Sequence, residues 1–404
     1  MRVSVIGQGY VGLSVAAGAA SVGHVVVGVD SNDSLISDLK KSQTFVPGIK
    51  RELLDELITS GSYIPTTNLD LIQKSDVVII AVPTPLDSNK KPDLSFLKAA
   101  TLEISKTIKN TALIINESTS YPGTLRNLIK PIFDSNSRVN FFFASAPERI
   151  DPGNEVWKIS NTPRIVAGLN QESTDKAIKF YKTFCSSIYQ ASSPEVAEAA
   201  KLFENSFRQI NIALANEFSV ISNLLGFSAN EAIHAAATKP FGFMPFFPSI
   251  GVGGHCIPVD PSYLSYAAEL VGAKPSFIEL ANQTNLNMVK HVVGRIKEEL
   301  GGKLKGLQIQ LAGISYKPEV SDLRESPALL LIEELEKEES VVTWCDPLVA
   351  EYKNQRSTEL NPLVDLGLII SPHKVIDLKV WLSGNTKVFD LSADANNYGW
   401  PKFL

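Results

Sequence analysis

The chain contains few cysteines, and their spacing limits the chemistry that they can support. The three cysteines, Cys185, Cys256 and Cys345, lie far apart, and no two of them form a Cys-x-x-Cys pair. Widely separated single cysteines argue against a disulfide framework and against a cysteine-rich metal site, and they fit a reducing compartment. We therefore expect no bound metal.

A strong charge of one sign and long apolar runs are also lacking. The net charge of the 404-residue chain is −5, so no overall field attracts nucleic acid or an anionic membrane. No apolar run approaches the roughly 18 residues of a membrane helix. The N-terminal residues enter a strand pattern at once and leave no room for a signal peptide. The sequence therefore predicts a cytoplasmic protein with no membrane or nucleic-acid partner.

The first half of the chain has the alternation that is typical of a parallel sheet covered by helices. Amphipathic segments separate short apolar runs at residues 3–6, 25–29, 77–82, 112–116 and 140–144. This alternation predicts a sheet with helices on both of its faces.

After Pro194 the pattern becomes helical and then returns to α/β. Residues 196–225 contain neither proline nor glycine, which predicts a helix about 45 Å long that serves as a central spine or dimer element. A capping box at residues 228–231 and a helix at 276–300 follow. Residues 307–313, 327–337 and 341–345 then have the pattern of strand, helix and strand. We expect an α/β fold class, with two Rossmann-like domains joined by a long central helical segment.

Residues 7–12 form the G-x-G-x-x-G pattern of a dinucleotide-binding turn. The pattern follows an apolar run, opens a helix and precedes Asp30 by 18 residues. In that context Gly7 makes the tight turn, Gly9 lets the backbone approach the pyrophosphate, and Gly12 packs the helix closely. Asp30 can accept hydrogen bonds from ribose hydroxyls and would repel a 2′-phosphate. The predicted cofactor is therefore NAD, with NADP disfavoured.

Polar residues follow three of the predicted strands. The turns are Val82-Pro83-Thr84-Pro85, Glu117-Ser118-Thr119 and Pro147-Glu148-Arg149. Each of them alone could be a simple turn, but three at the ends of successive strands favour a ligand cleft at the carboxyl edge of the sheet.

One cysteine lies on a glycine-rich loop, residues 251–260, which we call the thiol loop. Residues 251–260 read Gly-Val-Gly-Gly-His-Cys-Ile-Pro-Val-Asp, which puts Cys256 four residues before Asp260. Glycines let a ligand approach the main chain, so this placement favours a reactive thiol over a buried, apolar cysteine. A metal site with His255 is disfavoured, because adjacent side chains point apart.

Polar and basic residues also share one face of the predicted long helix. Lys201, Asn205 and Arg208 are spaced so that they form one stripe, which suits an anionic or oxyanionic ligand. The alternative is a solvated helix face, on which Glu204 pairs with Lys201 or Arg208.

A second basic pair flanks the loop that follows the strand at 307–313. Lys317 and Arg324 suit recognition of a phosphate or carboxylate group, and ordinary surface charges are the alternative.

Seven segments together resemble the UDP-glucose/GDP-mannose dehydrogenase family. They are GQGYVGL at 7–13, VPTPLD at 82–87, NEST at 116–119, APERIDPGN at 146–154, EAAKLFENSFRQINIALANE at 198–217, GVGGHCIPVDPSYL at 251–264 and SYKPEVSDLRESPA at 315–328. They occur in the family's order and span nearly the whole chain. The segments at 146–154 and 198–217 are more similar to members that act on UDP-N-acetylhexosamines than to UDP-glucose dehydrogenases.

This resemblance implies an NAD-dependent nucleotide-sugar 6-dehydrogenase of polysaccharide biosynthesis. Such an enzyme oxidises the C6 alcohol of a UDP-sugar to a carboxylate with two NAD⁺. The implied domains are an NAD-binding Rossmann domain at 1–190, a central helical dimerisation domain with the catalytic loop at 191–302, and a UDP-sugar-binding Rossmann-like domain at 303–404. A homodimer or higher homo-oligomer is expected.

The resemblance also implies a role for each candidate residue. Cys256 is the expected nucleophile, which passes through a thiohemiacetal and a thioester. The implied catalytic residues are Cys256, Lys201, Asn205, Asp260, Thr119 and Glu148. The implied cofactor-binding residues are Gly7, Gly9, Tyr10, Val11, Gly12, Asp30, Pro83, Thr84, Thr119 and Arg324. The implied substrate-binding residues are Glu148, Arg149, Lys201, Asn205, Arg208, Phe246, Gly253 and Lys317.

The chain departs from the family pattern just before the catalytic loop. Ser249-Ile250 stands where the family commonly has Gly-Pro, which leaves the choice of sugar open. The alternatives are a UDP-glucose 6-dehydrogenase, a catalytically silent nucleotide-sugar-binding protein and a two-electron hydroxy-acid dehydrogenase. The presence of Cys256 and Lys201 disfavours the silent protein, and a two-electron enzyme would not need the thiol loop.

Overall fold

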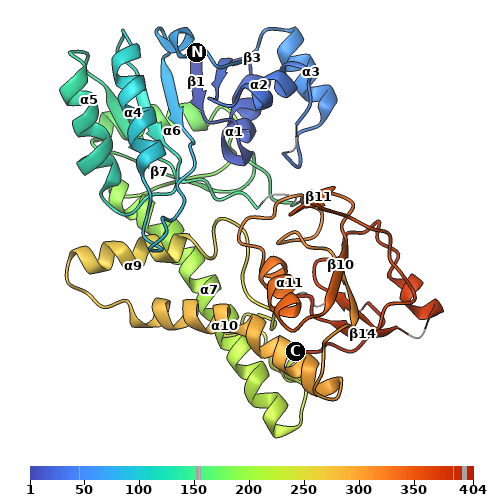
Figure 1. The fold of residues 1–404 in the computed structure, drawn as a ribbon. Helices are drawn as coiled ribbons and strands as arrows, with labels where there is room; N and C mark the ends of the chain where they lie inside the picture. Colours follow the sequence, from blue (N-terminus) through green and yellow to red (C-terminus); the bar gives the residue numbers. More distant parts are fainter. Residues whose placement is uncertain (45, 152–153, 155, 385, 394–397) are drawn as a thin grey trace. The chain divides into compact units, whose positions relative to one another are not determined.

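The computed structural model describes residues 1–44, 46–151, 154, 156–384, 386–393 and 398–404. The chain divides into two compact units, whose elements are labelled in Figure 1. The first unit comprises Met1–Glu204 and Ser262–Ala273, and the second comprises Asn205–Pro261 and Lys274–Leu404. Within the described residues, no helix combines the length and the apolar character that crossing a membrane requires.

The first unit is built on a sheet whose eight described strands run in the order β3-β2-β1-β4-β5-β6-β7-β8. The strands are β1 (Arg2–Ile6), β2 (Val25–Val29), β3 (Tyr63–Thr66), β4 (Val77–Ile80), β5 (Leu113–Asn116), β6 (Phe142–Ser145), β7 (Arg164–Gly168) and β8 (Ile188–Gln190). Neighbouring strands are parallel, except that β7 is antiparallel to β6. The central strands are buried along almost their whole length, as strands covered on both faces must be.

Helices cover this sheet. They are α1 (Tyr10–Ser21), α2 (Asp33–Lys40), α3 (Arg51–Thr59), α4 (Ser95–Thr107), α5 (Lys130–Asn136) and α6 (Gln171–Tyr181), with the short helical turns η1 (Leu69–Ile72) and η2 (Leu125–Ile129). Residues of α1, α2, α3 and α6 share one buried apolar cluster with alternate residues of β1, β4 and β5. Because alternate strand residues point to opposite faces, this cluster covers one side of the sheet. The helices α4 and α5 pack against each other, and α4 also contacts β4 (Figure 1).

The second unit contains a smaller parallel sheet. Its described strands run in the order β10-β9-β13-β14. They are β9 (Gln308–Ala312), β10 (Val341–Cys345), β13 (Leu366–Ile369) and β14 (Lys387–Asp390), beside a hairpin of β11 (Glu351–Tyr352) and β12 (Gln355–Arg356). The other elements are α8 (Ala229–Ala237), α10 (Ser276–Glu299), α11 (Pro327–Lys337) and η3 (Leu378–Ser383). Apolar residues of α10 and α11 form one core cluster with those of β9, β10 and β13.

Two helices have residues in both units: α7 (Pro194–Leu225) and α9 (Asp260–Leu270). The predicted long helix is confirmed, and it begins two residues earlier than expected. Ser228 is the N-cap of α8, because its Oγ accepts the N–H of Glu231 at 3.2 Å, which is one of the two hydrogen bonds of the predicted capping box. The strand, helix and strand expected at residues 307–313, 327–337 and 341–345 are β9, α11 and β10.

Three strands of the first unit, β3, β7 and β8, were not predicted from the sequence. β3 contains Pro65, which obscures a strand pattern. β7 begins with the charged residue Arg164 and runs antiparallel, which an alternation of strands and helices does not predict. The predicted run at 140–144 is shifted, because β6 begins at Phe142.

Candidate active site

The glycine-rich turn between β1 and α1 has the close backbone contacts that dinucleotide-binding turns need. Gly7 has a φ of +93°, and a Cβ there would lie 2.4 Å from the carbonyl oxygen of Ala81. A Cβ on Gly12 would lie 1.8 Å from the carbonyl oxygen of Gly7. A Cβ on Gly9, in contrast, would meet nothing within 4 Å. The turn is therefore closed at two glycines and open at the third, where a phosphate can approach.

Asp30 is oriented by the same turn. Its Oδ2 accepts the N–H of Gln8 at 2.8 Å, and its Oδ1 accepts the N–H of Asn32 at 2.9 Å. The side chain of Gln8 is buried and accepts the hydroxyl of Tyr63 at 2.7 Å. Asp30 itself is half-buried, so its carboxylate is both held and accessible, as recognition of a ribose requires.

The turns after β4 and β5 lie together at the carboxyl edge of the sheet. Ser118 Oγ donates to the carbonyl of Val82 at 2.9 Å, which joins the two turns. Thr84 is buried, and its carbonyl accepts the hydroxyl of Tyr263 at 2.9 Å. Pro83 is exposed beside it. The structure thus brings together two of the three predicted polar turns through direct hydrogen bonds.

Lys201 on α7 reaches the second of these turns. Its Nζ donates to the Oγ1 of Thr119 at 2.8 Å, and both residues are buried. Three residues before Lys201, the buried Glu198 accepts the N–H of Gly123 at 2.7 Å and that of Leu125 at 3.1 Å. Burial raises the pKa of Glu198 to about 8, although these two hydrogen bonds act in the opposite direction. Glu198 therefore fixes the segment that follows Thr119 to α7.

The third turn carries Glu148, which is part of a buried ionic cluster. Arg164 of β7 pairs with Glu148, and its Nη1 lies 3.0 Å from the Oε2 of Glu117. The hydroxyl of Tyr181 donates to the other carboxylate oxygen of Glu117. Burial raises the pKa of Glu117 to about 7, and the charge of Arg164 counteracts part of that rise. The sequence missed Arg164 and Tyr181, because both belong to elements far along the chain from Glu148.

Arg149, next to Glu148, is paired with α7. Its Nε and Nη2 donate to the two carboxylate oxygens of Glu204 at 2.9 and 2.5 Å, and its Nη1 donates to the carbonyl of Pro163 at 2.9 Å. Glu204 thus pairs with Arg149, a partner that the sequence analysis had not considered. Bidentate pairing of this kind fixes the orientation of a guanidinium group.

In the second unit the thiol loop leads into α9. Cys256 is exposed, and its carbonyl accepts the N–H of Asp260 at 2.9 Å. Asp260 is fully buried, and its Oδ2 accepts the side-chain amide of Asn205 at 2.7 Å. Three of the predicted catalytic residues therefore lie on one hydrogen-bonded path within this unit.

The residues of the predicted stripe on α7 differ in how far they are exposed. Lys201 is buried, Asn205 is half-buried and Arg208 is exposed. Phe246, predicted to contact substrate, is half-buried and packs edge-on against Phe207, with ring centroids 5.8 Å apart.

Asp346 anchors the loop between β9 and α11 through hydrogen bonds to its backbone. The Oδ2 of Asp346 accepts the N–H groups of Ile314 and Ser315 at 2.9 and 3.2 Å, and its Oδ1 lies 2.9 Å from the Nε2 of His373. Burial raises the pKa of Asp346, but these hydrogen bonds outweigh burial and the net pKa is lowered. The Nδ1 of His373 accepts the N–H of Glu319 at 2.8 Å.

The two predicted basic residues of this loop differ in their surroundings. Lys317 is half-buried, whereas Arg324 is exposed and pairs with Asp322 at 2.6 Å. Arg324 also contributes its carbonyl, which accepts the N–H of Gly254 on the thiol loop at 3.0 Å.

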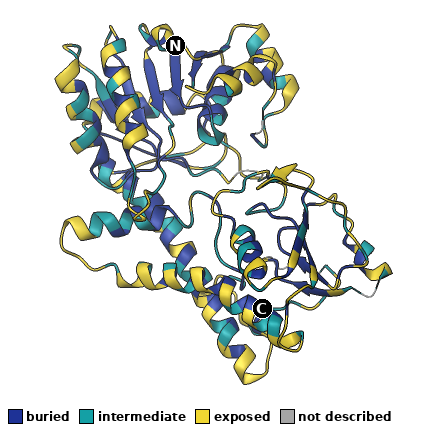
Figure 2. Cartoon of the chain, in the orientation of Figure 1, coloured by how far each residue is buried: buried dark blue, intermediate teal, exposed yellow. Residues whose placement is uncertain are grey.

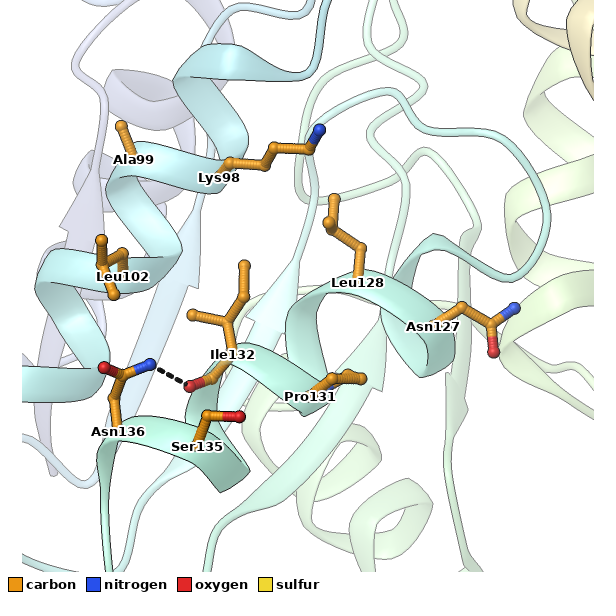
Figure 3. Close-up of a pocket in the computed structure, with 9 residues that line it drawn as sticks. All are labelled: Lys98, Ala99, Leu102, Asn127, Leu128, Pro131, Ile132, Ser135 and Asn136. Carbon is orange, nitrogen blue, oxygen red and sulfur yellow. Dashed lines mark hydrogen bonds between the residues drawn. The ribbon is translucent and has the colours of Figure 1, made fainter.

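A groove elsewhere on the first unit contains none of the predicted site residues. It has a volume of about 450 Å³ and lies between α4 and the η2–α5 segment (Figure 3). Its lining residues are Lys98, Ala99, Leu102, Asn127, Leu128, Pro131, Ile132, Ser135 and Asn136. In the described residues, no three His, Cys, Asp or Glu side chains are grouped so that they could hold a metal ion.

The geometry of the first unit indicates a class of enzyme. A closed glycine turn, an oriented acid after β2 and polar turns at the carboxyl edge of the sheet are those of an NAD-dependent dehydrogenase. The chain belongs to the UDP-glucose/GDP-mannose dehydrogenase family. Residues 1–185 match the NAD binding domain of that family, residues 195–287 its central domain and residues 310–377 its UDP binding domain.

Relatives of known name cover nearly the whole chain. It is 34% identical to Protein CapL of Staphylococcus aureus, over 92% of this chain and 90% of that protein. It is 35% identical to UDP-N-acetyl-D-glucosamine 6-dehydrogenase of Pseudomonas aeruginosa, over 90% of this chain and 86% of that protein. Among solved structures, the UDP-D-ManNAc dehydrogenase of Pyrococcus horikoshii superposes with a TM-score of 0.87 at 31% identity, over 99% of this chain and 98% of that one.

Proposed function

We propose that this chain oxidises the C6 alcohol of a UDP-N-acetylhexosamine to a carboxylate, with the thiol of Cys256 as nucleophile. Each turnover consumes one UDP-sugar, one water and two NAD⁺. The named relatives support the substrate class, since the P. aeruginosa relative is a UDP-N-acetyl-D-glucosamine 6-dehydrogenase and the P. horikoshii structure a UDP-D-ManNAc dehydrogenase.

The observation that carries the proposal is the contrast between the three thiols. Burial raises the pKa of Cys185 and that of Cys345 to about 11, so both stay protonated at neutral pH. Cys256 alone among them is exposed, and it lies on a glycine-rich loop beside Asp260. Reactive cysteines occupy accessible positions, whereas buried ones are inert.

The residues of the first unit fit NAD as cofactor. Gly9 would face the pyrophosphate, Asp30 would accept hydrogen bonds from the ribose, and the N-terminus of α1 would direct N–H groups at the phosphates. When bound, NAD⁺ accepts the hydride removed from C6. In our proposal Tyr10, Val11, Pro83, Thr84 and Arg324 complete its site.

Cys256 captures the aldehyde that the first oxidation produces. Addition of its sulfur to C6 forms a thiohemiacetal, the second oxidation converts this adduct into a thioester, and water then releases the carboxylate and the thiol. Covalent capture prevents a reactive aldehyde from escaping between the two oxidations. Thr119 and Glu148, the second of which pairs with Arg164, are assigned to positions near the reacting centre and the nicotinamide.

Lys201, Asn205 and Asp260 are assigned to charge and proton handling at C6. A lysine ammonium or an amide N–H aimed at an alkoxide stabilises the developing negative charge. The hydrogen bond from Asn205 to Asp260 supports this assignment, because it holds the amide and the carboxylate in fixed orientations. The bond between Lys201 and Thr119 fixes the lysine in the same manner.

We also propose that residues 1–190, 191–302 and 303–404 act as NAD-binding, central dimerisation and UDP-sugar-binding domains. Lys317, Arg149, Arg208, Phe246 and Gly253 are assigned to the UDP-sugar. A location in the cytoplasm stays a prediction.

A homodimer built on the central helices is part of the proposal. Exposed apolar residues recur along α7 from Phe207 onward and on α10, where Figure 2 shows long exposed stretches. They include Phe207, Leu214, Ile221, Leu224 and Leu225 on α7, and Phe277, Leu280 and Leu286 on α10. Apolar surface of this extent favours a partner. Light scattering that gives only the 43.9 kDa mass of one chain at micromolar concentration would contradict the dimer.

The substrate is tested with a panel of UDP-sugars, followed by NADH absorbance. We expect UDP-GlcNAc, or its C2 or C4 epimer, to give a higher kcat/KM than UDP-glucose. If UDP-glucose is clearly the best substrate, the chain is a UDP-glucose 6-dehydrogenase, and the proposed substrate class is wrong while the mechanism stands.

A further inference from the structure

The thiol loop contacts Tyr316 of the loop after β9, besides Glu325 and Pro327. A Cβ on Gly254 would lie 2.8 Å from the Cε2 of Tyr316 and 3.0 Å from its Cδ2. A Cβ on Gly253 would lie 2.8 Å from the Cβ of Tyr316. Side chains at these two positions would therefore collide with Tyr316, and the glycines permit the close contact.

A backbone hydrogen bond reinforces this contact. The N–H of Gly254 donates to the carbonyl of Arg324 at 3.0 Å, and Gly254 is buried. Gly254 also has a φ of +81°, which other residues rarely adopt. The thiol loop is thus held at a point two residues before Cys256.

The surface that receives the thiol loop is itself firmly built. The N–H of Tyr316 donates to the carbonyl of Asp322 at 3.1 Å, which closes the loop on itself. The carbonyl of the preceding residue, Ser315, accepts the hydroxyl of Ser371 at 2.6 Å. Asp346 also accepts the N–H of Ser315, so the residue before Tyr316 is anchored.

We propose that Tyr316 is a positioning residue that couples occupancy of the UDP site to the position of the Cys256 thiol. The coupling rests on the proposed function, which assigns Lys317 to the UDP-sugar. Lys317 is the chain neighbour of Tyr316, so a ligand that fixes Lys317 also fixes the ring against Gly253 and Gly254. The thiol loop is then held in one place when substrate is bound.

The first test measures the reactivity of Cys256 without any substrate. Iodoacetamide alkylates the full-length protein, and peptide mass spectrometry follows Cys256 separately from Cys185 and Cys345. Tyr316→Ala removes the ring, and we expect alkylation of Cys256 to become about tenfold faster as the loop opens locally. Tyr316→Phe keeps the ring, and its rate should match that of the wild type.

The second test adds UDP, which binds without turnover. In the wild type and in Tyr316→Phe, saturating UDP should slow alkylation of Cys256 about fivefold or more, because a fixed loop opens less often. In Tyr316→Ala the rate should not respond to UDP, although calorimetry should still detect UDP binding within about threefold of the wild-type Kd. In turnover, kcat should fall in Tyr316→Ala while KM for the UDP-sugar changes little.

A matched pair of glycine variants separates ring contact from backbone strain. Gly254 and Gly272 have φ values of +81° and +79°, but a Cβ on Gly272 would meet nothing within 4 Å. Gly254→Ala should therefore increase alkylation of Cys256 far more than Gly272→Ala does. In the Tyr316→Ala background, Gly254→Ala should have a smaller effect, because the ring that it would strike is gone and only the strain of the positive φ remains.

Two results would overturn the proposal. One is a Tyr316→Ala protein whose Cys256 is alkylated at the wild-type rate and responds to UDP as the wild type does. The other is a Gly254→Ala effect that is the same with and without the Tyr316 ring. If the wild type oxidises no UDP-sugar, the proposed function fails, while the ligand-free alkylation rates still decide the role of Tyr316.

Discussion

The turn after β1 and the turn after β9 occupy equivalent places in two Rossmann-like units, yet their acids have different tasks. Asp30 follows β2, accepts the N–H of Gln8 and is half-buried. Asp346 follows β10, accepts the N–H groups of Ile314 and Ser315, and is fully buried beside His373. The first acid is accessible, as our proposal for the cofactor requires, and the second holds a loop.

Loop length explains this difference. In the first unit α1 begins at Tyr10, directly after the glycine turn, so in our proposal the helix N-terminus itself faces the cofactor. In the second unit residues 313–326 separate β9 from α11, and that longer loop provides Tyr316, Lys317 and Arg324. The same architecture thus offers backbone N–H groups in one unit and side chains in the other.

The largest expected effect concerns Cys256, which lies in the second unit, outside the proposed NAD site of the first. Its substitution should abolish the reaction without changing nucleotide binding. Cys256→Ala should lower the overall oxidation by several orders of magnitude, because no covalent adduct forms. Binding of NAD⁺ and of UDP should be unchanged, since neither proposed nucleotide site uses the sulfur. Steady-state rates and calorimetry measure both. Cys345→Ser is the control and should stay active, and near wild-type activity of Cys256→Ala would make that thiol structural.

Removal of the buried acid should cost stability. Asp346→Ala leaves the N–H groups of Ile314 and Ser315 and the ring of His373 without their acceptor, which should lower the free energy of unfolding by about 3 kcal/mol. Asp346→Asn keeps one acceptor oxygen and should lose less. Urea unfolding at neutral pH measures both.

The contribution of Asp346 should also depend on pH. Its pKa is lowered in the folded state, so its stabilising effect is complete above its usual pKa of about 4 and is lost as pH falls below that value. The difference between wild type and Asp346→Asn should therefore shrink in acid. A difference that is constant down to pH values well below 4 would contradict the assigned role.

The half-buried acid, Asp30, should control cofactor choice instead. Asp30→Ala should leave the free energy of unfolding within about 1 kcal/mol of the wild type. It should narrow the preference for NAD⁺ over NADP⁺ by about tenfold or more, because a carboxylate no longer opposes the 2′-phosphate. Ratios of kcat/KM for the two cofactors measure this. If the ratio is the same in wild type and variant, Asp30 does not determine the choice of cofactor.

The smallest expected effect concerns Glu198 in the first unit, whose pH response has the opposite sign to that of Asp346. Its pKa is raised to about 8, so its contribution to stability is complete below the usual pKa of a glutamate and is lost as pH rises through about 8. The Tm of the wild type should fall by a few degrees more than that of Glu198→Gln between about pH 5 and pH 9. Parallel Tm curves would show that Glu198 does not titrate in this range.

The sequence predicted the features that are local along the chain. The glycine turn, Asp30, the long helix and the strand, helix and strand after residue 305 all follow from short patterns, and the structure contains each of them. Glu148 was proposed as a site residue from its place after a predicted strand. Its partner Arg164 was not, because the pair forms only when β7 lies antiparallel to β6.

Contacts between side chains that are distant along the chain could not be predicted from the sequence either. Spacing put Lys201 and Asn205 on one helix face, but it could not show that Lys201 contacts Thr119 and that Asn205 contacts Asp260. The sequence also could not show that His373 anchors the loop between β9 and α11, because that histidine follows β13 and lies far along the chain from Ser315.

The stoichiometry of NADH formation tests the central claim most directly. A known, limiting amount of the best UDP-sugar is converted to completion with excess NAD⁺, and NADH, remaining sugar and any aldehyde trapped by a hydrazine are measured. Capture by Cys256 predicts two NADH for each sugar consumed and no trapped aldehyde. One NADH per sugar, with an aldehyde or ketone released into solution, would contradict the four-electron mechanism.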